Sequence, residues 1–295
     1  MAGDEAGPGF RGIGSLLGFA TKVLAPAGVL TAVLYYFGYT RERARYGYFG
    51  VDLGTVGLTT TDYLVRSAGP LFAPLAAVLV TGVAVIILHH LLALLFDRLA
   101  LRWRRVACGV LAAVALITLA IGAIGLQRRA EVLAGPLVSP VALAAGALLL
   151  DYSAENSRIR AALPGRVAAV LDSNAALRRG LVAGLLLIAA FWATASVAQS
   201  QGETDARAIE VSLMFQPKAT VYSRQRLQIR APGVGMVRLS DGKDSAYAFR
   251  YDGLRTLAHS QGRWFLLPAG WTRDNGASVI LLPDSGDDIR VDLAP

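Results

Sequence analysis

The chain has 295 residues, of which 54% are hydrophobic and only 17% are charged. Soluble domains carry about 25% charged residues, and the apolar excess lies within residues 13–200, so a wholly soluble protein is excluded. Residues 1–199 contribute +7 of the net charge of +8, from arginines that flank apolar stretches. The positive-inside rule explains this placement, and we expect no nucleic-acid partner.

Five stretches lack acidic and basic side chains and have 18 to 30 residues, which is long enough to cross a bilayer as helices. Residues 1–202 are therefore predicted to form an all-α membrane bundle of five transmembrane helices. The helices are expected at about 16–39, 70–96, 106–127, 132–150 and 179–200. The fourth is the weakest, because Pro136 and Pro140 each remove a backbone donor and can kink a helix.

Arginine and lysine side chains are unevenly divided between the predicted loops. If the N-terminus is cytoplasmic, the cytoplasmic segments hold eleven of them and the outer loops hold six. This bias favours a cytoplasmic N-terminus, and five crossings then place the C-terminal domain outside the cytoplasm. The lipid bilayer is the first partner that the sequence predicts.

The segment after the first predicted helix is both aromatic and basic. Such side chains favour lipid headgroups, where their polar ends stay hydrated. A ligand or partner site beneath the outer domain is the alternative. The residues concerned are Arg41, Arg43, Arg45, Tyr46, Tyr48 and Phe49. A helix that leads into the second span is expected to start at Thr61–Asp62, with Thr60 or Thr61 as its cap.

Two features inside the predicted membrane bundle are candidates for chemistry or packing. His89 and His90 lie toward the end of the second predicted span, where an ionisable group is a candidate proton relay or ligand. The alternative is a neutral histidine that bonds to its neighbours. Ala142, Ala145 and Gly146 form a small-residue face, which is predicted to pack helices within the chain or between chains.

Beyond Gln201 the hydrophobic period shortens, and turn residues separate short strand-like runs. Residues 203–295 are predicted to form an all-β domain of six to nine strands, either a small sandwich or an open barrel. The acidic turn at 284–288 is expected to close a hairpin. The predicted core is Val211, Leu213, Leu227, Val237, Phe249, Leu257, Phe265, Leu266, Ile280 and Ile289.

The acidic residues and the histidine of this domain match no recognised site. Beside Asp241, Asp244, Asp252 and His259, the acidic turn at 284–288 offers oxygen ligands for calcium, but it lacks the ligand spacing of a calcium loop. No serine lies in a nucleophile elbow. We therefore expect no catalytic residue, no bound metal and no cofactor.

Two stretches resemble parts of one family of multi-pass membrane proteins from actinobacteria. They are YYFGYTRERARYGYFGVDLGTVGLTTTDYLVRS after the first predicted helix, and YDGLRTLAHSQGRWFLLPAGW with IRVDL near the C-terminus. The resemblance implies a membrane bundle followed by a small β module in a bacterial plasma membrane. It implies no activity and brings no functional residues.

These observations favour a non-enzymatic protein that presents an outer β domain to a protein partner or an envelope component. The alternative is a subunit of a small transporter or channel, and either protein could assemble as a homo-oligomer. The transporter is less favoured, because the predicted spans hold no acidic residue and show no inverted repeat.

Overall fold

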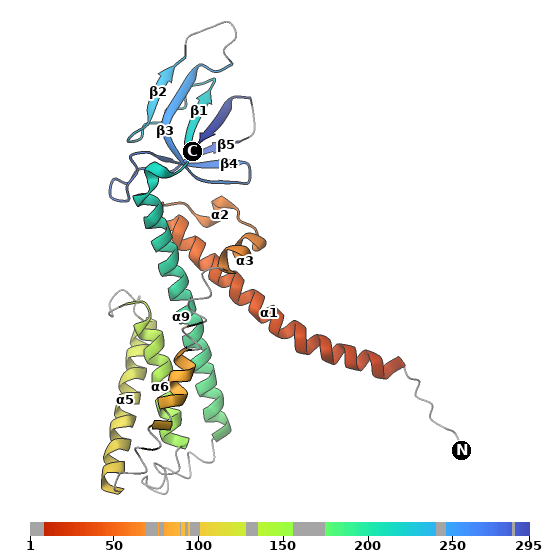
Figure 1. Cartoon of the computed structure of the whole chain (residues 1–295), viewed down its shortest axis with the longest axis vertical. Helices are drawn as coiled ribbons and strands as arrows, with labels where there is room; N and C mark the ends of the chain where they lie inside the picture. The colour runs from red at the N-terminus through yellow and green to blue at the C-terminus, as the bar shows by residue number, and fades with distance from the viewer. Residues whose placement is uncertain are drawn as a thin grey trace, which may run out of the picture. The chain divides into compact units, whose positions relative to one another are not determined.

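The computed structural model describes residues 9–68, 76, 80–88, 90–91, 94, 101–127, 135–155, 175–239, 246–284 and 287–295. Helices come first and an antiparallel sheet follows at the C-terminal end, as predicted (Figure 1). The chain divides into two compact units. We name Met1–Gly69 with Gln201–Pro295 the sheet unit, and Pro70–Ser200 the helical unit. This division differs from the predicted boundary after residue 202, because the segment that follows the first helix packs with the sheet.

The helical unit contains α5 (Leu101–Gln127), α6 (Val138–Glu155) and the larger part of α9 (Ala175–Val211). Small residues bring α5 and α6 close together. A Cβ atom on Gly146 would lie 2.9 Å from the backbone nitrogen of Leu119, and one on Gly122 would lie 2.9 Å from the Cα atom of Leu143. The small face predicted around Gly146 therefore packs helices within one chain.

Two of the described helices are long and apolar enough to cross a membrane, over Gly109–Leu126 and Ala176–Val211. Only 17% and 11% of these windows are buried, whereas the core helix of a soluble protein is mostly buried. They coincide with the third and fifth predicted spans. The predicted count of five is not reached, since two helices qualify among the described residues. The second predicted span lies mostly outside the described residues.

Helix α6 starts later than the predicted span at 132–150. It begins at Val138, so Pro136 precedes it and Pro140 lies in its first turn. Proline is tolerated there because the first backbone N–H groups of a helix have no partner within it. Its apolar part, Val138–Tyr152, is shorter than the two candidate spans. At about 1.5 Å per residue it is roughly 22 Å long, against a hydrocarbon core of about 30 Å.

The helices of the sheet unit are α1 (Gly9–Tyr48), α2 (Leu53–Val56) and α3 (Thr60–Ala68), together with the end of α9. Helix α1 continues nine residues past its predicted end at residue 39, so the basic and aromatic segment is helical. Thr59 caps α3 in place of the predicted Thr60 or Thr61. Its hydroxyl accepts the N–H of Asp62 at 3.3 Å, and the Asp62 carboxylate accepts the N–H of Thr59 at 2.8 Å. This reciprocal pair is a capping box.

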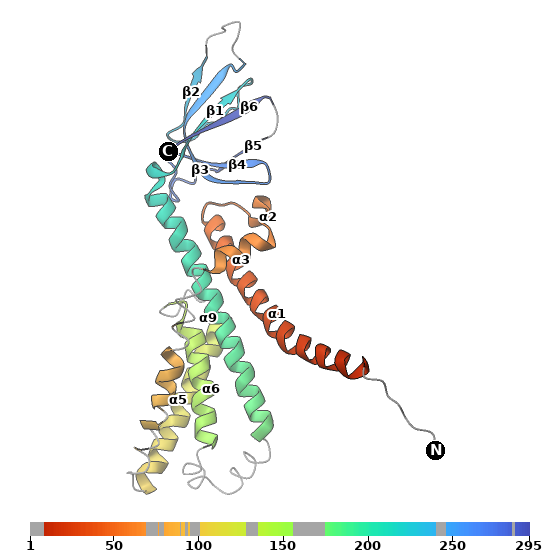
Figure 2. The same ribbon diagram turned by 45° about the vertical axis from the view of Figure 1, so that its right-hand side comes forward.

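Six strands form one antiparallel sheet, with β2 paired to β3 beside the order β5-β4-β3-β1-β6. The strands are β1 (Lys218–Ser223), β2 (Gly235–Arg238), β3 (Phe249–Ser260), β4 (Arg263–Pro268), β5 (Ile280–Pro283) and β6 (Ile289–Ala294). Figure 2 shows β6 beside β1. The acidic turn at 284–288 therefore joins β5 and β6 at opposite ends of the strand order, and the predicted hairpin there is wrong.

Strand β4 is buried on both of its faces. Leu266 packs in a cluster with Val221, Tyr251 and other residues of the sheet itself. Phe265 and Leu267 point the other way, into a second cluster with the helical segment after α1. The burial of Leu213, Phe265 and Leu266 confirms those predicted core residues, and Leu227, Phe249, Leu257, Ile280 and Ile289 are partly buried. Val211 and Val237 are exposed, so their prediction is wrong.

Candidate functional site

The aromatic residues predicted at the membrane interface lie against the sheet. Tyr46 and Phe49 are 2% and 4% exposed, and they pack with Phe265, Leu267 and Trp271. The ring centroids of Phe49 and Trp271 are 4.8 Å apart. Burial of Tyr46 and Phe49 fixes the end of α1 on the sheet and leaves little of either side chain for contact with lipid.

Tyr48 connects this aromatic cluster to the end of α9. Its hydroxyl donates a hydrogen bond to Glu210, and the guanidinium of Arg273 lies 4.5 Å from the centre of its ring. The hydrogen bond to Glu210 raises the pKa of Tyr48, burial raises it further, and Arg273 partly opposes both. The backbone N–H of Arg273 donates to the second Glu210 oxygen at 2.9 Å. Glu210 therefore joins α9 to both α1 and the loop after β4.

A pocket of about 590 Å³ opens beside this cluster, and we name it the aromatic pocket. Its volume lies in the range of about 300–1,000 Å³ that is usual for ligand pockets. It is lined by Tyr48, Phe49, Gly50, Val51, Asp52, Thr55, Trp271, Arg273, Gly276, Ala277, Ser278, Val279 and Leu281. Aromatic rings, aliphatic side chains and two opposite charges thus meet in one concave site.

Strand β5 lies at one end of the strand order and borders the aromatic pocket through Leu281. Its pairing partner is β4, with Leu281 opposite Phe265 and Leu282 opposite Trp264. In the sheet as described, no further strand pairs with the other edge of β5. An edge strand presents backbone N–H and C=O groups that an extended peptide can bond.

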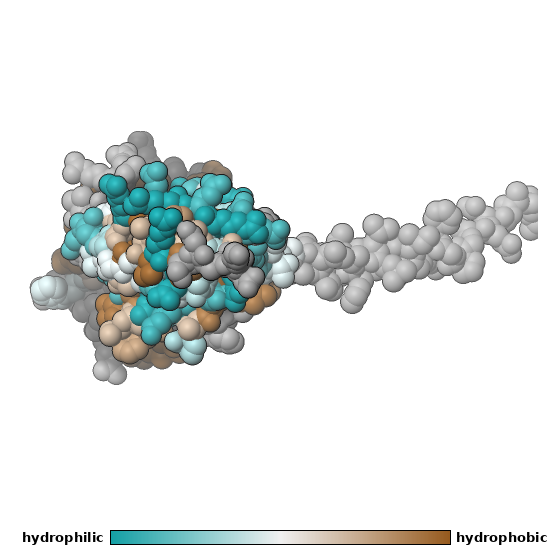
Figure 3. Space-filling model, turned by 90° about the horizontal axis from the view of Figure 1, so that it is seen from above, coloured by the Kyte–Doolittle hydropathy of each residue, from teal (hydrophilic) through white to brown (hydrophobic). Residues whose placement is uncertain are grey.

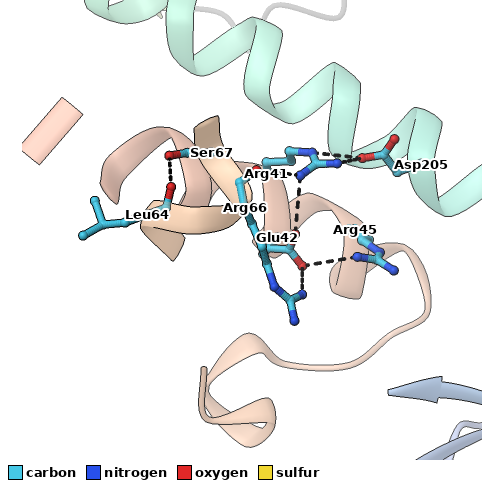
Figure 4. A network of polar contacts seen from close by, with 7 residues as sticks. All are labelled: Arg41, Glu42, Arg45, Leu64, Arg66, Ser67 and Asp205. Carbon is cyan, nitrogen blue, oxygen red and sulfur yellow. Dashed lines mark hydrogen bonds and ion pairs between the residues drawn. The ribbon is translucent and has the colours of Figure 1, made fainter. Parts of the chain in front are cut away.

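A second site is built from charged side chains (Figure 4). The buried carboxylate of Glu42 on α1 forms ion pairs with two guanidinium groups. Arg66 of α3 lies 3.1 Å from it, and Arg45 lies 3.6 Å from it. Arg41 turns toward α9, where its Nε donates to Asp205 at 2.9 Å. Burial lowers the pKa of Arg66, but Glu42 and Tyr46 raise it, with an increase as the result. The network holds α1, α3 and α9 together with charged guanidinium groups.

A pocket of about 280 Å³, which we name the arginine pocket, opens next to this network. It combines the end of α1, Leu58 before α3, the last turn of α3 and the second half of β3. The lining residues are Arg41, Glu42, Arg45, Tyr46, Leu58, Arg66, Leu257, Ala258, His259 and Ser260. Three of the predicted contact residues, Arg41, Arg45 and Tyr46, therefore line this pocket, whereas Tyr48 and Phe49 line the aromatic pocket. Arg43 is exposed on the same helix and does not line it.

His259 belongs to a small cluster at the edge of the arginine pocket. Its Nε2 lies 2.8 Å from Asp284, and the Trp264 indole N–H donates to the same carboxylate at 2.9 Å. The imidazole lies against Trp264 with ring centres 4.2 Å apart and the ring planes tilted by 37°. A carboxylate that orients a histidine is one part of a catalytic triad, but none of the described contacts brings a serine, threonine or cysteine nucleophile to His259.

The predicted histidine site in the second span is described only in part. His90 is exposed, and its Nδ1 lies 2.9 Å from the carbonyl oxygen of Ile86 one turn earlier. His89 lies outside the described residues, as do Asp241 and Asp244. Across the described ranges, no group of three His, Cys, Asp or Glu side chains is placed to hold a metal.

Comparisons with protein-family models, with curated proteins and with solved structures give no match for this chain. Membership of an actinobacterial membrane family therefore stays a prediction, and the candidate sites depend on their geometry alone. Four residues of these two sites were not predicted from the sequence: Trp271, Arg273, Glu210 and Arg66. The one sequence signal for packing at this site was the unbroken apolar run of β4, which indicates a strand that is buried on both faces.

Proposed function

We propose that this protein is a non-enzymatic, multi-pass protein of a bacterial plasma membrane whose sheet unit lies outside the cytoplasm. In this proposal the sheet unit binds an extended segment of a partner protein. Two apolar helices with largely exposed side chains support insertion into a bilayer. The excess of basic residues in the predicted cytoplasmic loops supports the orientation.

The observation that carries the proposed function is the aromatic pocket beside the edge strand β5. An extended peptide along β5 would gain backbone hydrogen bonds from the edge and would place a side chain over the pocket. Phe49 and Trp271 supply an aromatic floor that the core already holds in place. Arg273 and Asp52 supply opposite charges that can select the residues of the partner.

The surface of the sheet unit also suits a protein exposed to water. Viewed from the sheet end, hydrophilic residues cover much of the coloured part of this face, and hydrophobic side chains show between them (Figure 3). The described side chains of α5 and α9 instead expose many large apolar groups, such as Leu116, Ile117 and Leu187. Lipid chains would cover those groups without any hydrogen-bonding demand.

Site-specific photocrosslinking in living cells tests the binding function. A photoreactive phenylalanine derivative replaces Leu281 beside the pocket, or Met236 on β2 as the matched control. Both side chains are apolar and 41% exposed, so they differ in place rather than in accessibility. We expect a protein adduct from position 281 and none from position 236.

The crosslinked segment then defines a synthetic peptide for binding to the purified full-length protein. Leu281→Asp should weaken binding of that peptide, and Met236→Asp should leave it unchanged. Equal adducts at both positions, or adducts with glycan or lipid only, would refute a peptide site at β5. Ion or solute flux through reconstituted protein would instead support the alternative function, a transporter or channel subunit.

A further inference from the structure

The arginine pocket has a charge imbalance that its own residues do not remove. Three guanidinium groups line it, from Arg41, Arg45 and Arg66, and Glu42 is the one carboxylate in the lining. Arg41 is neutralised from outside the lining by Asp205 on α9. Arg45 and Arg66 therefore share the single charge of Glu42, which leaves about one positive charge among these five side chains. The Asp284 carboxylate at the edge of the pocket bonds to His259 instead.

The pocket also has hydrogen-bonding capacity that is not used. The Nε atom of Arg45 and the Oε1 atom of Glu42 are both shielded from solvent, and neither has a hydrogen-bond partner. Its Nη1 atom is 3.6 Å from Glu42, which is long for a hydrogen bond. A guanidinium carries five N–H donors, and Arg66 directs its hydrogen bonds to Glu42 and Tyr46. The side chains of Arg45 and Arg66 are 24% and 37% exposed, so an acceptor in the pocket can reach their other N–H donors.

Size and lining restrict the chemistry of this acceptor. At about 280 Å³ the pocket is at the small end for ligand sites, so a nucleotide or a peptide side-chain cluster does not suit it. Guanidinium forks match the oxygen geometry of phosphate groups. Leu58, Leu257 and Ala258 add an apolar wall, which suits a short carbon stem next to the anion.

We propose that the arginine pocket binds a singly charged phosphodiester through Arg45 and Arg66. A phosphodiester carries one negative charge, which equals the charge that Glu42 leaves uncompensated. A phospholipid headgroup and a soluble glycerophosphodiester share this chemistry, and the experiment separates the two sources. The proposed site is distinct from the aromatic pocket and can fail without affecting the proposed peptide binding.

Calorimetric titration of the full-length protein in nanodiscs of zwitterionic lipid tests the site. One arm adds glycerophosphoglycerol, and the other measures binding to vesicles that contain phosphatidylglycerol. Arg45→Gln should weaken binding about tenfold, the usual loss for one hydrogen bond to a charged group. Arg43→Gln is the matched control, because it removes the same charge from the exposed face of the same helix.

Glu42→Gln gives a prediction of opposite sign. Removing the carboxylate raises the uncompensated positive charge at the pocket, so phosphodiester binding should tighten. This is expected even though Arg45 and Arg66 lose their shared partner. A purely structural network would give no tighter binding in this variant. A chemical-shift change of the Arg45 Nε–H group on titration tests the unmodified protein and does not depend on how any variant folds.

Binding in the vesicle arm alone assigns the site to a lipid headgroup, and binding in both arms assigns it to the phosphodiester itself. Two outcomes overturn the proposal. The first is no binding in either arm. The second is equal weakening by Arg43→Gln and Arg45→Gln, which would indicate attraction by the basic surface as a whole.

Discussion

Phe49→Ala tests the contact between the end of α1 and the sheet. The side chain is 4% exposed, and its ring centre lies 4.8 Å from that of Trp271 and 5.4 Å from that of Tyr48. Removing a buried phenylalanine costs about 3–5 kcal/mol, from lost burial and from the cavity that remains. At roughly 2–4 °C per kcal/mol for a unit of this size, Tm should fall by about 6–20 °C.

Thermal unfolding of the full-length protein in nanodiscs measures this change, followed by near-ultraviolet circular dichroism of the sheet unit. Phe215→Ala is the matched control, since it makes the same chemical change at a side chain that is 79% exposed. The control should alter stability by no more than about 0.5 kcal/mol. If both variants unfold at the same temperature, Phe49 does not pack on the sheet, and the lipid contact predicted from the sequence would stand.

Three further perturbations test the other contacts of the sheet unit. Gly202→Ala should lower Tm, because the new Cβ atom would clash with the Arg41 carbonyl oxygen where α9 meets α1. A double-mutant cycle on Arg41 and Asp205 should give a coupling energy of about 0.5–1 kcal/mol, since Asp205 is partly exposed. Asp62→Ala should destabilise α3 near pH 6, and the loss should vanish at acid pH, as hydrogen exchange of the α3 amides can measure. Hydrogen bonds from the Thr59 backbone and hydroxyl lower the pKa of Asp62 below 3.8, so its contribution is present above that pH and disappears as pH falls through the lowered value.

The glycine substitution has a matched control, and the other two perturbations each have an outcome that would contradict them. Gly47 lies in α1 with no atom within 4 Å of a built Cβ, so Gly47→Ala should raise stability by about 0.5–1 kcal/mol. A decrease there would indicate that α1 does not continue as far as Tyr48. Additive effects of the Arg41 and Asp205 substitutions would show that the ion pair does not contribute to stability. A pH-independent effect of Asp62→Ala would show that its charge has no role.

Local patterns in the sequence predicted the elements better than their contacts. The capping residue of α3 was within reach of the sequence, because Asp62 lies three residues after Thr59 as a capping box requires. Thr59, Thr60 and Thr61 are all suitable capping residues, and the prediction of Thr60 or Thr61 was wrong because it did not take the spacing to Asp62 into account. The apolar run Phe265–Leu267 indicated a strand buried on both sides, yet nothing local showed that its second face would meet α1.

The aromatic and basic segment shows why the site itself was not predictable. Arginine beside tyrosine and phenylalanine has the same composition at a lipid interface and in a packed junction. The difference depends on partners more than 150 residues away, such as Trp271 for Phe49 and Glu210 for Tyr48. Likewise, Arg45 and Arg66 share Glu42 only because α3 folds back on α1. The hydrophobic periodicity of one segment carries no information about such contacts with distant residues.

In the proposed five-span topology, the side of the membrane that the sheet unit faces depends on whether α6 is part of a full crossing. Its apolar part, Val138–Tyr152, is too short alone, so flanking residues would have to complete the span. If they do, five crossings from a cytoplasmic N-terminus place the sheet unit outside. If α6 does not cross, the same N-terminus places the sheet unit inside.

Cysteine labelling of intact cells with an impermeant reagent distinguishes the two arrangements, in a background where the single cysteine, Cys108, is replaced by alanine. Asp274→Cys reports on an exposed loop of the sheet unit, and Ser157→Cys reports on the predicted cytoplasmic segment after α6. We expect labelling at position 274 and protection at position 157. The reverse pattern would place the sheet unit inside, and with it both pockets. An inner location would leave the contacts of the aromatic pocket intact but would require a cytoplasmic partner.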